Sequence, residues 1–228
     1  MIKNLLRGFG ALSLALVPLL ASPPAQAAPS SARMWAAEVT TLADALGLVA
    51  VDDEDRTGYR RSAFRHWNSG DLTDGCNTRN EVLLAEATLA PAVGAGCKLT
   101  GGTWLSYYDT QEVARPGALD IDHMVPLAEA WDSGASAWTA ARREAYANDQ
   151  GAAASLVAVT ARTNRQKADQ DPAQWLPPTP EAHCRYTGEW VATKLRWQLT
   201  ADTTEMDALK VFAEGPCKGT IVQYTPAP

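Results

Sequence analysis

The adjacent residues Asp122 and His123 offer the two groups that hydrolysis of a phosphodiester requires, and they lie in the stretch 120–126, which reads Asp-Ile-Asp-His-Met-Val-Pro. That reaction needs a cation that polarises a phosphoryl oxygen and a base that deprotonates water. Neighbouring side chains on a strand point to opposite faces, so the Asp122 carboxylate can hold a metal while the His123 imidazole remains free as the base.

Asn164 and Lys167 follow a second apolar stretch, residues 156–159. The Asn164 side chain is a neutral oxygen ligand that would leave most of the coordination shell of a metal to water and substrate. Lys167 lies three residues further on, on the same face of a predicted helix, where its ammonium could meet a phosphate oxygen. An Asp-His pair alone on a strand is ordinarily structural. The order of strand, strand and helix is what favours chemistry here.

Three further residues have both a functional and a structural interpretation. Asp120 shares a strand face with Asp122, so it is either an outer-shell residue of the metal site or a carboxylate at the end of a strand. Arg79 lies close to Cys76, where a disulfide would hold it rigidly enough for a bidentate phosphate contact; the alternative is a salt bridge on a helix surface. Trp67 is expected in the core and not as a platform for stacked bases.

The other two histidines, His66 and His183, have no metal-ligand spacing, and we expect them at the surface or partly buried.

Apolar spacing and turn residues predict the elements that position these side chains. The first helix is expected over 34–48, and the last is capped by Asp202 with Glu205 three residues later. Between them we expect a helix over 76–89, a strand or hairpin over 103–108, strands over 119–123 and 156–159, helical segments over 127–131, 137–147 and 163–168, an irregular segment over 171–178, and one further helix before Asp202.

The first residues have the pattern of an export signal. Lys3 and Arg7 precede an apolar run over 9–21, and residues 25–27 fit signal peptidase, with cleavage expected after Ala27. No later stretch approaches the roughly 20 apolar residues that span a bilayer. We therefore expect a secreted, extracellular protein with no membrane segment, in which residues 28–228 form one domain.

The four cysteines, Cys76, Cys97, Cys184 and Cys217, predict two disulfides in an oxidising compartment. Three pairings are formally possible. The order along the chain favours Cys76–Cys97 and Cys184–Cys217, because each pair closes one local loop. A zinc site of four cysteines is disfavoured, since the chain has no Cys-x-x-Cys pair.

The charge balance is unusual for a protein that binds nucleic acid. The chain has 20 basic and 26 acidic residues, and two of the basic ones, Lys3 and Arg7, lie in the expected signal, which leaves a net charge of −8. Proteins that hold DNA by charge alone are usually basic over a broad face. An acidic nuclease needs local basic groups and a bound cation, so we expect weak, salt-sensitive and non-specific binding.

The Asp-His-x-x-Pro strand, the later apolar strand and the Asn-x-x-Lys helix resemble the HNH nucleases, including the nuclease domain of RNA-guided CRISPR enzymes. The closer resemblance is to secreted actinobacterial HNH-family proteins related to the C-terminal nuclease domain of GmrSD-type restriction enzymes. It covers most of the chain after the signal. Besides the core, it includes residues 59–64, 75–80, 130–135, 146–149, 175–178 and 184–186.

This resemblance implies an α+β fold in which a ββα-metal core of the HNH or His-Me finger type, at about residues 117–178, is embedded in a mainly helical domain with two disulfides. It implies Asp122 and Asn164 as ligands of a single divalent metal, most often Mg²⁺ with Mn²⁺ as another option, and His123 as general base. It also supports Arg79 beside the site. Ser155 stands where the family often has an asparagine that orients the loop, and Asn148 is a candidate substitute.

Together these observations predict a monomeric, metal-dependent endonuclease that hydrolyses DNA or also RNA, with His123, Lys167 and Arg79 in catalytic roles. One alternative is a non-catalytic extracellular binding protein on a decayed nuclease fold, and the intact set of Asp122, His123, Asn164 and Lys167 disfavours it. Another is a metallohydrolase with a different substrate, such as a peptidase. That class is disfavoured because the chain has neither H-E-x-x-H nor a serine nucleophile elbow.

Overall fold

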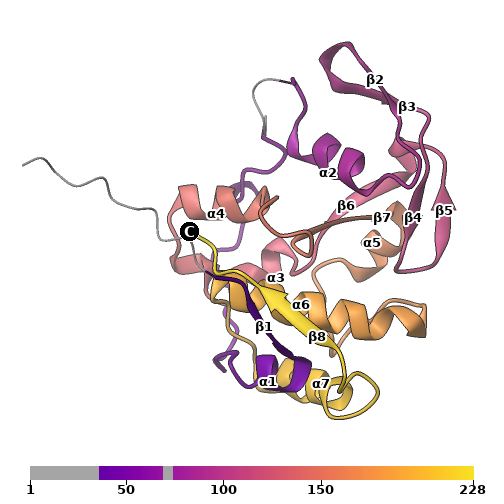
Figure 1. Ribbon diagram of the computed structural model, residues 1–228. Coiled ribbons are helices and arrows are strands. Elements are labelled where there is room, and N and C mark those ends of the chain that lie inside the picture. The colour runs from indigo at the N-terminus through magenta and orange to yellow at the C-terminus, as the bar shows by residue number, and fades with distance from the viewer. Residues whose placement is uncertain (1–35, 69–73) are drawn as a thin grey trace, which may run out of the picture. The chain divides into compact units, whose positions relative to one another are not determined.

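A two-stranded antiparallel sheet carries the Asp122-His123 pair in the computed structural model, which describes residues 36–68 and 74–228. Its strands are β6 (Leu119–His123) and β7 (Leu156–Thr160). The chain passes from β7 directly into α5 (Ala161–Lys167), because the Thr160 side chain caps that helix by accepting from the Thr163 backbone N–H. The expected order of strand, strand and helix is therefore present (Figure 1).

The two faces of this sheet are buried against different helices. One face packs on α2 (Thr78–Glu86). The buried residues of this face and of the helix, together with Trp104, form a small hydrophobic cluster: Val82 and Leu83 from α2, and Leu119, Ile121, Leu156 and Ala158 from the sheet. Val157 and Val159 point the other way, into the main core. This alternation is the period of two of a strand, and it sends Asp122 towards α5 and His123 towards the α2 side.

The connection between β6 and β7, residues 124–155, contains α3 (Leu127–Asp132) and α4 (Ala140–Ala147). Both helices were expected. The second begins three residues later than predicted, because the Thr139 side chain accepts from the Arg142 backbone N–H and caps α4 there. The last turn of α4 returns the chain to the start of β7.

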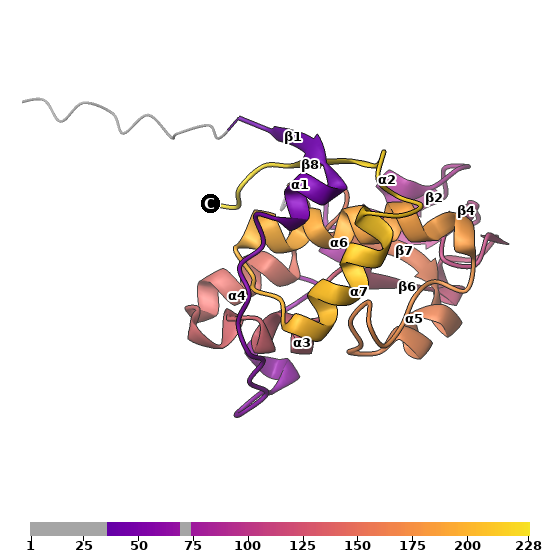
Figure 2. The same ribbon diagram turned by 90° about the horizontal axis from the view of Figure 1, so that it is seen from below.

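The C-terminal part supplies the main core around α6 (His183–Trp197) and α7 (Thr203–Ala213). Asp202 caps α7 by accepting from the Glu205 backbone N–H, as its sequence predicted. The two ends of the described chain meet in a second sheet, where β1 (Glu38–Thr41) pairs antiparallel with β8 (Ile221–Tyr224) beside α1 (Leu42–Leu46) and α6 (Figures 1 and 2).

The strand β1 corrects the expected helix over 34–48. In the described part of that range only Leu42–Leu46 is α-helical, and residues 38–41 are extended. The spacing of apolar residues there is compatible with a helix, but the partner strand β8 lies at the other end of the chain. A pairing between such distant segments leaves no local signal in the sequence.

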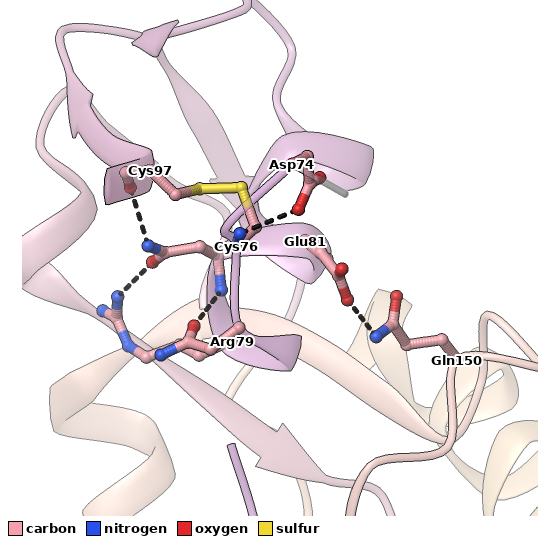
Figure 3. Close-up of a disulfide and its surroundings, with 8 residues drawn as sticks. Asp74, Cys76, Arg79, Glu81, Cys97 and Gln150 are labelled. Carbon is pink, nitrogen blue, oxygen red and sulfur yellow. Dashed lines mark hydrogen bonds between the residues drawn. A yellow bond between two sulfur atoms is a disulfide. The ribbon is translucent and has the colours of Figure 1, made fainter. Parts of the chain in front are cut away.

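Two small hairpins complete the described strands: β2 (Ala92–Gly94) with β3 (Lys98–Thr100), and β4 (Trp104–Ser106) with β5 (Gln111–Val113). Short 3₁₀ turns occupy Arg61–Ala63, Ala95–Cys97, Pro116–Ala118, Ala135–Ala137 and Pro180–Ala182. The Cys76–Cys97 disulfide joins the start of α2 to the first hairpin (Figure 3), and Cys184–Cys217 joins α6 to the segment after α7. Both pairings are the ones that the order along the chain favoured.

The described residues, 36–68 and 74–228, contain no helix with the length and apolar character of a membrane span. The expected export signal, residues 1–27, lies outside the described residues.

A buried lysine organises the contact between α3, α6 and α7. Lys194 is fully buried and donates to Glu129 at 2.9 Å, to Glu205 and to the Thr200 carbonyl. Asp132 faces the same region and is paired with Arg56. The carboxylates of Glu54, Glu129 and Asp132 lie within 4.8 Å of one another, so this region holds more acidic than basic groups.

This crowding generates a prediction for the pH dependence of stability. Burial, followed by repulsion from Glu129, raises the pKa of Glu54 from 4.5 to about 8. The unfolded chain loses this proton at lower pH than the folded protein, so the free energy of unfolding should fall as the pH rises from 4.5 to about 8. Glu54→Gln should remove that loss and raise the midpoint of thermal unfolding above that of the wild type at pH 8, measured with a chelator present. Glu112→Gln, on the exposed β5, is the matched control. In this variant the midpoint of thermal unfolding should differ between acidic and alkaline pH as much as it does in the wild type. If the unfolding midpoint of Glu54→Gln changed with pH in parallel with the wild type, the raised pKa of Glu54 would not be the cause of the loss.

Candidate active site

Asp122 is almost fully buried, and its two carboxylate oxygens have different surroundings. Oδ2 accepts a hydrogen bond from the Tyr108 hydroxyl at 2.6 Å and another from the Lys167 ammonium. No hydrogen bond from a described residue reaches Oδ1, and Asp122 lines a cavity. Burial raises the pKa of Asp122 and the ion pair with Lys167 opposes that rise, so the lysine supports the charged carboxylate.

His123 is held by a hydrogen bond that defines which ring nitrogen can act as a base. Its Nε2 lies 3.0 Å from the Ala147 carbonyl oxygen. A carbonyl only accepts, so Nε2 carries the proton and the lone pair of the neutral ring is on Nδ1. Burial lowers the pKa of His123 to about 3, which keeps the imidazole neutral near pH 7. The neutral ring therefore has its lone pair at Nδ1, the one ring nitrogen that could accept a proton.

Asn164 lies on α5 and lines the same cavity as Asp122 and His123. Its side-chain amide donates to the Asp120 carboxylate at 3.4 Å, which leaves the amide oxygen for another partner. Asp120 is partly exposed and also lies 3.6 Å from Arg165. Asp120 thus contacts a residue of the cavity without lining it, and its role as an outer-shell residue of a metal site stays a prediction.

The cavity has a volume of about 250 Å³ and joins the end of β6 to one side of α5. Two exposed arginines, Arg61 and Arg165, supply positive charge to its wall. Oxygen donors from one carboxylate and one amide suit Mg²⁺, which keeps several waters and needs few protein ligands. Asp122 Oδ1 and the Asn164 amide oxygen therefore fit a small hard cation at this position.

Lys167 does not have the surface position that the sequence predicted. Its side chain is fully buried, and its ammonium donates to Asp122, to the His123 carbonyl at 3.0 Å and to the Met124 carbonyl at 2.7 Å. All three N–H groups are used. Lys167 is thus a structural counter-ion of Asp122 and cannot meet a phosphate, because the helix face it shares with Asn164 turns into the core at its position.

Arg79 is likewise engaged away from the cavity (Figure 3). Its guanidinium donates to the carbonyls of Pro116 and Leu119, each at 3.0 Å, and lies 3.4 Å from the Asn80 amide oxygen. These contacts hold α2 against the segment that leads into β6. The predicted phosphate contact is therefore wrong for Arg79, which has a structural role with backbone carbonyls in place of the alternative salt bridge.

Of the two candidates for bracing a loop at the site, Asn148 and Ser155, it is Asn148 that bonds to a segment beside His123. Its amide oxygen accepts from the Asn68 backbone N–H and from the Thr78 hydroxyl, and its amide nitrogen donates to the Arg65 and Glu144 carbonyls. Ser155 instead donates to Asp149 at 2.6 Å. The loop that Asn148 braces is the segment 65–68, beside His123.

Several residues at the site had no signal in the sequence. Tyr108 comes from the turn between β4 and β5, and Arg61 from a 3₁₀ turn far from β6 along the chain. His66 lies close to His123, with 6.2 Å between ring centroids, and its Nδ1 is 2.9 Å from the Phe64 carbonyl. His183, by contrast, contacts the Pro177 carbonyl at 2.9 Å and does not line the cavity. Tyr108, Arg61 and His66 are identified only by the three-dimensional structure, which brings distant segments together.

The fold and the cavity define a disulfide-containing protein of mixed helices and small sheets, in which the carboxylates of Asp122 and Asp169, an imidazole, an amide and two arginines line one cavity. Such a set suits hydrolysis of a phosphate ester. The chain belongs to the family described as GmrSD restriction endonucleases, C-terminal domain, whose family model matches residues 82–210. Membership suggests that the protein is a nuclease. The match includes Asp122, His123 and Asn164 and begins after Arg61 and Trp67.

A relative from Arthroderma benhamiae is described as an uncharacterized secreted protein. It is 37% identical over 163 residues, which are 72% of this chain and 78% of the relative. Its description and the two disulfides of this chain are both consistent with an extracellular protein. No solved structure matches the chain.

The buried position of Lys167 predicts a loss of stability when its charge is removed. Lys167→Met leaves Asp122 buried without its partner, which should lower the free energy of unfolding by about 3–5 kcal/mol in urea denaturation. Lys210→Met, which removes an exposed lysine on α7, is the control and should change it little.

The double variant Lys167→Met/Asp122→Leu should recover much of the loss, because both members of the buried pair are then apolar. If Lys167→Met left the free energy of unfolding unchanged and weakened substrate binding, Lys167 would contact a phosphate oxygen, as the sequence predicted.

Proposed function

We propose that the protein is a secreted, metal-dependent endonuclease of the HNH type, which hydrolyses phosphodiester bonds of DNA or also RNA. The observation that carries the proposal is the free Nδ1 of His123 beside a cavity that Asp122 and Asn164 also line. The membership in a restriction-endonuclease family and the β6-β7-α5 order of the core support the same assignment.

Each residue of the site has a defined part in this reaction. Asp122 Oδ1 and the Asn164 amide oxygen would hold the metal, Mg²⁺ in the first instance. When bound, the metal polarises the phosphoryl oxygen and stabilises the leaving oxygen. His123 Nδ1 takes a proton from the attacking water, and the bond from Nε2 to the Ala147 carbonyl keeps the ring in the tautomer that permits this.

Substrate binding in this proposal depends on Arg61 and Arg165. Both are exposed and line the cavity, and Arg guanidinium groups bind phosphate oxygens through paired N–H donors. The rest of the protein is acidic overall, so attraction is confined to the neighbourhood of the site. The binding is therefore weak and non-specific, and the protein acts as a monomer on the strand that it cuts.

The central test is digestion of plasmid DNA and of RNA with Mg²⁺ or Mn²⁺, with and without a chelator. His123→Ala should abolish cleavage while Mn²⁺ binding, followed by calorimetry, and thermal unfolding remain close to the wild type. Asp122→Asn, which keeps the shape of the side chain, should lose both Mn²⁺ binding and cleavage. Loss of Mn²⁺ binding in His123→Ala would make His123 a ligand, and cleavage unaffected by the chelator would exclude the proposed mechanism.

The salt dependence of binding tests the role of the two arginines. The logarithm of affinity for DNA should fall with the logarithm of salt concentration with the shallow slope of about two to four phosphate contacts. Arg61→Ala and Arg165→Ala should each lower the slope by about one contact and reduce turnover. Lys98→Ala, on the exposed β3, should change neither quantity. A steep slope that neither arginine variant affects would assign binding to a different face.

A further inference from the structure

The indole of Trp67 lies flat against the imidazole of His123. The ring centroids are 5.3 Å apart and the ring planes differ by 24°. Tyr146 is also nearly parallel to the imidazole, at 6.4 Å and 21°. His66 lies beside both rings, roughly perpendicular to each, with its centroid 5.3 Å from that of Trp67 and 6.2 Å from that of His123.

A flat contact of this kind provides a restraint that the hydrogen bond to Ala147 cannot provide. The last torsion of a histidine side chain has a broad energy profile, so a single hydrogen bond at Nε2 leaves the ring free to rock about that contact. An aromatic ring stacked on the imidazole fixes the plane of the ring. Since Nδ1 lies in that plane, the stacked indole determines the direction of its lone pair.

Trp67 reaches this position in an unfavourable backbone conformation. Its φ is 59°, in the left-handed region, which is sterically unfavourable for a bulky L-residue. Such a conformation persists only where the surroundings enforce it. The surroundings here are Asn148 and Thr78, which bind the backbone on both sides of Trp67.

The hydrogen bonds of Asn148 hold the backbone of Trp67 in its left-handed conformation. Its amide oxygen accepts from the Asn68 backbone N–H at 3.0 Å, and its amide nitrogen donates to the Arg65 carbonyl at 2.7 Å. The bond from the Thr78 backbone N–H to the Asn68 carbonyl, at 3.0 Å, holds the same segment from α2. Asn148 uses both of its amide hydrogens and both acceptor positions of its oxygen, so it is fully committed to this arrangement.

We propose that Trp67 is a positioning residue for His123, and that Asn148 acts through Trp67 by holding it in its left-handed conformation. This inference rests on the proposed function of His123 as general base. It assigns a catalytic consequence to two residues that do not line the cavity themselves. Trp67 also lies before the segment that the family model matches.

Steady-state cleavage of a fluorescent oligonucleotide tests the proposal. Trp67→Ala should lower kcat about ten- to a hundredfold while KM stays within about twofold, because a misdirected base slows the chemical step without weakening binding. Trp67→Phe keeps a flat ring and should recover most of kcat. The control is Trp131→Ala, which removes another partly buried tryptophan with edge contacts to Tyr59 and Phe64 and should leave kcat close to the wild type.

Asn148→Ala should reproduce the loss of Trp67→Ala, and the double variant should be no worse than either single variant, since both act through one contact. Asn80→Ala, which removes a partly buried side-chain amide bonded to the Cys97 carbonyl, is the matched control. A KM increase with unchanged kcat in Trp67→Ala would make Trp67 a substrate contact and overturn the proposal, as would unchanged kcat or a Phe variant no better than Ala.

A second readout needs no activity. The ¹⁵N spectrum of the His123 ring, assigned by comparison with His123→Ala, should show one tautomer with the proton on Nε2 in the wild type and in Trp67→Phe. In Trp67→Ala the bond to Ala147 should still select that tautomer, but the ring signals should broaden because the ring rocks about this bond. Ring signals as sharp in Trp67→Ala as in the wild type overturn the positioning role. If the wild type cuts no nucleic acid, the proposed function fails, and this spectrum still decides whether Trp67 positions the ring.

Discussion

The buried ion pair between Lys167 and Asp122 is the constraint on which the site depends. It crosses from α5 to β6, and the same ammonium also holds the His123 and Met124 carbonyls, so the end of the strand and the end of the helix are fixed at one point. Asn164 is one turn back along that helix and is fixed with it. A buried charge that lost its partner would be costly, which makes this junction resistant to displacement.

The basic residues of the site have two separate tasks. Lys167 is enclosed by protein and neutralises a single carboxylate, whereas Arg61 and Arg165 face solvent at the cavity. In the proposed function, this division would allow an acidic protein to bind a polyanionic substrate. One positive charge stabilises the fold of the site, and two exposed guanidinium groups, from segments on either side of β6, would bind phosphate in the proposed function. Neither task requires a basic surface over the whole protein.

The parts of the fold that local sequence determines were predictable. The strands β6 and β7, the helix α5 and the Asp202 cap follow from apolar spacing and from side chains that bond within a few residues. Asp122, His123 and Asn164 line one cavity because that local order brings them together. Long-range contacts were not predictable. The pairing of β1 with β8, the approach of Tyr108 and Arg61, and the inward turn of Lys167 depend on segments that are distant in sequence. Helical spacing alone does not say which face of α5 is buried.

The connection between β6 and β7 starts just after His123, and its residues Ala147 and Asn148 return to the surroundings of the same histidine. Ala147 accepts the hydrogen bond of His123, and Asn148 binds the segment 65–68, so the last turn of α4 has to return to a fixed place. Surface connections ordinarily drift in length as a family diverges. Here a residue gained or lost inside α4 would move Ala147 and Asn148 away from these partners. The architecture thus sets an evolutionary limit on the length of this helix, so that the gene cannot be lengthened there without displacing the histidine ring.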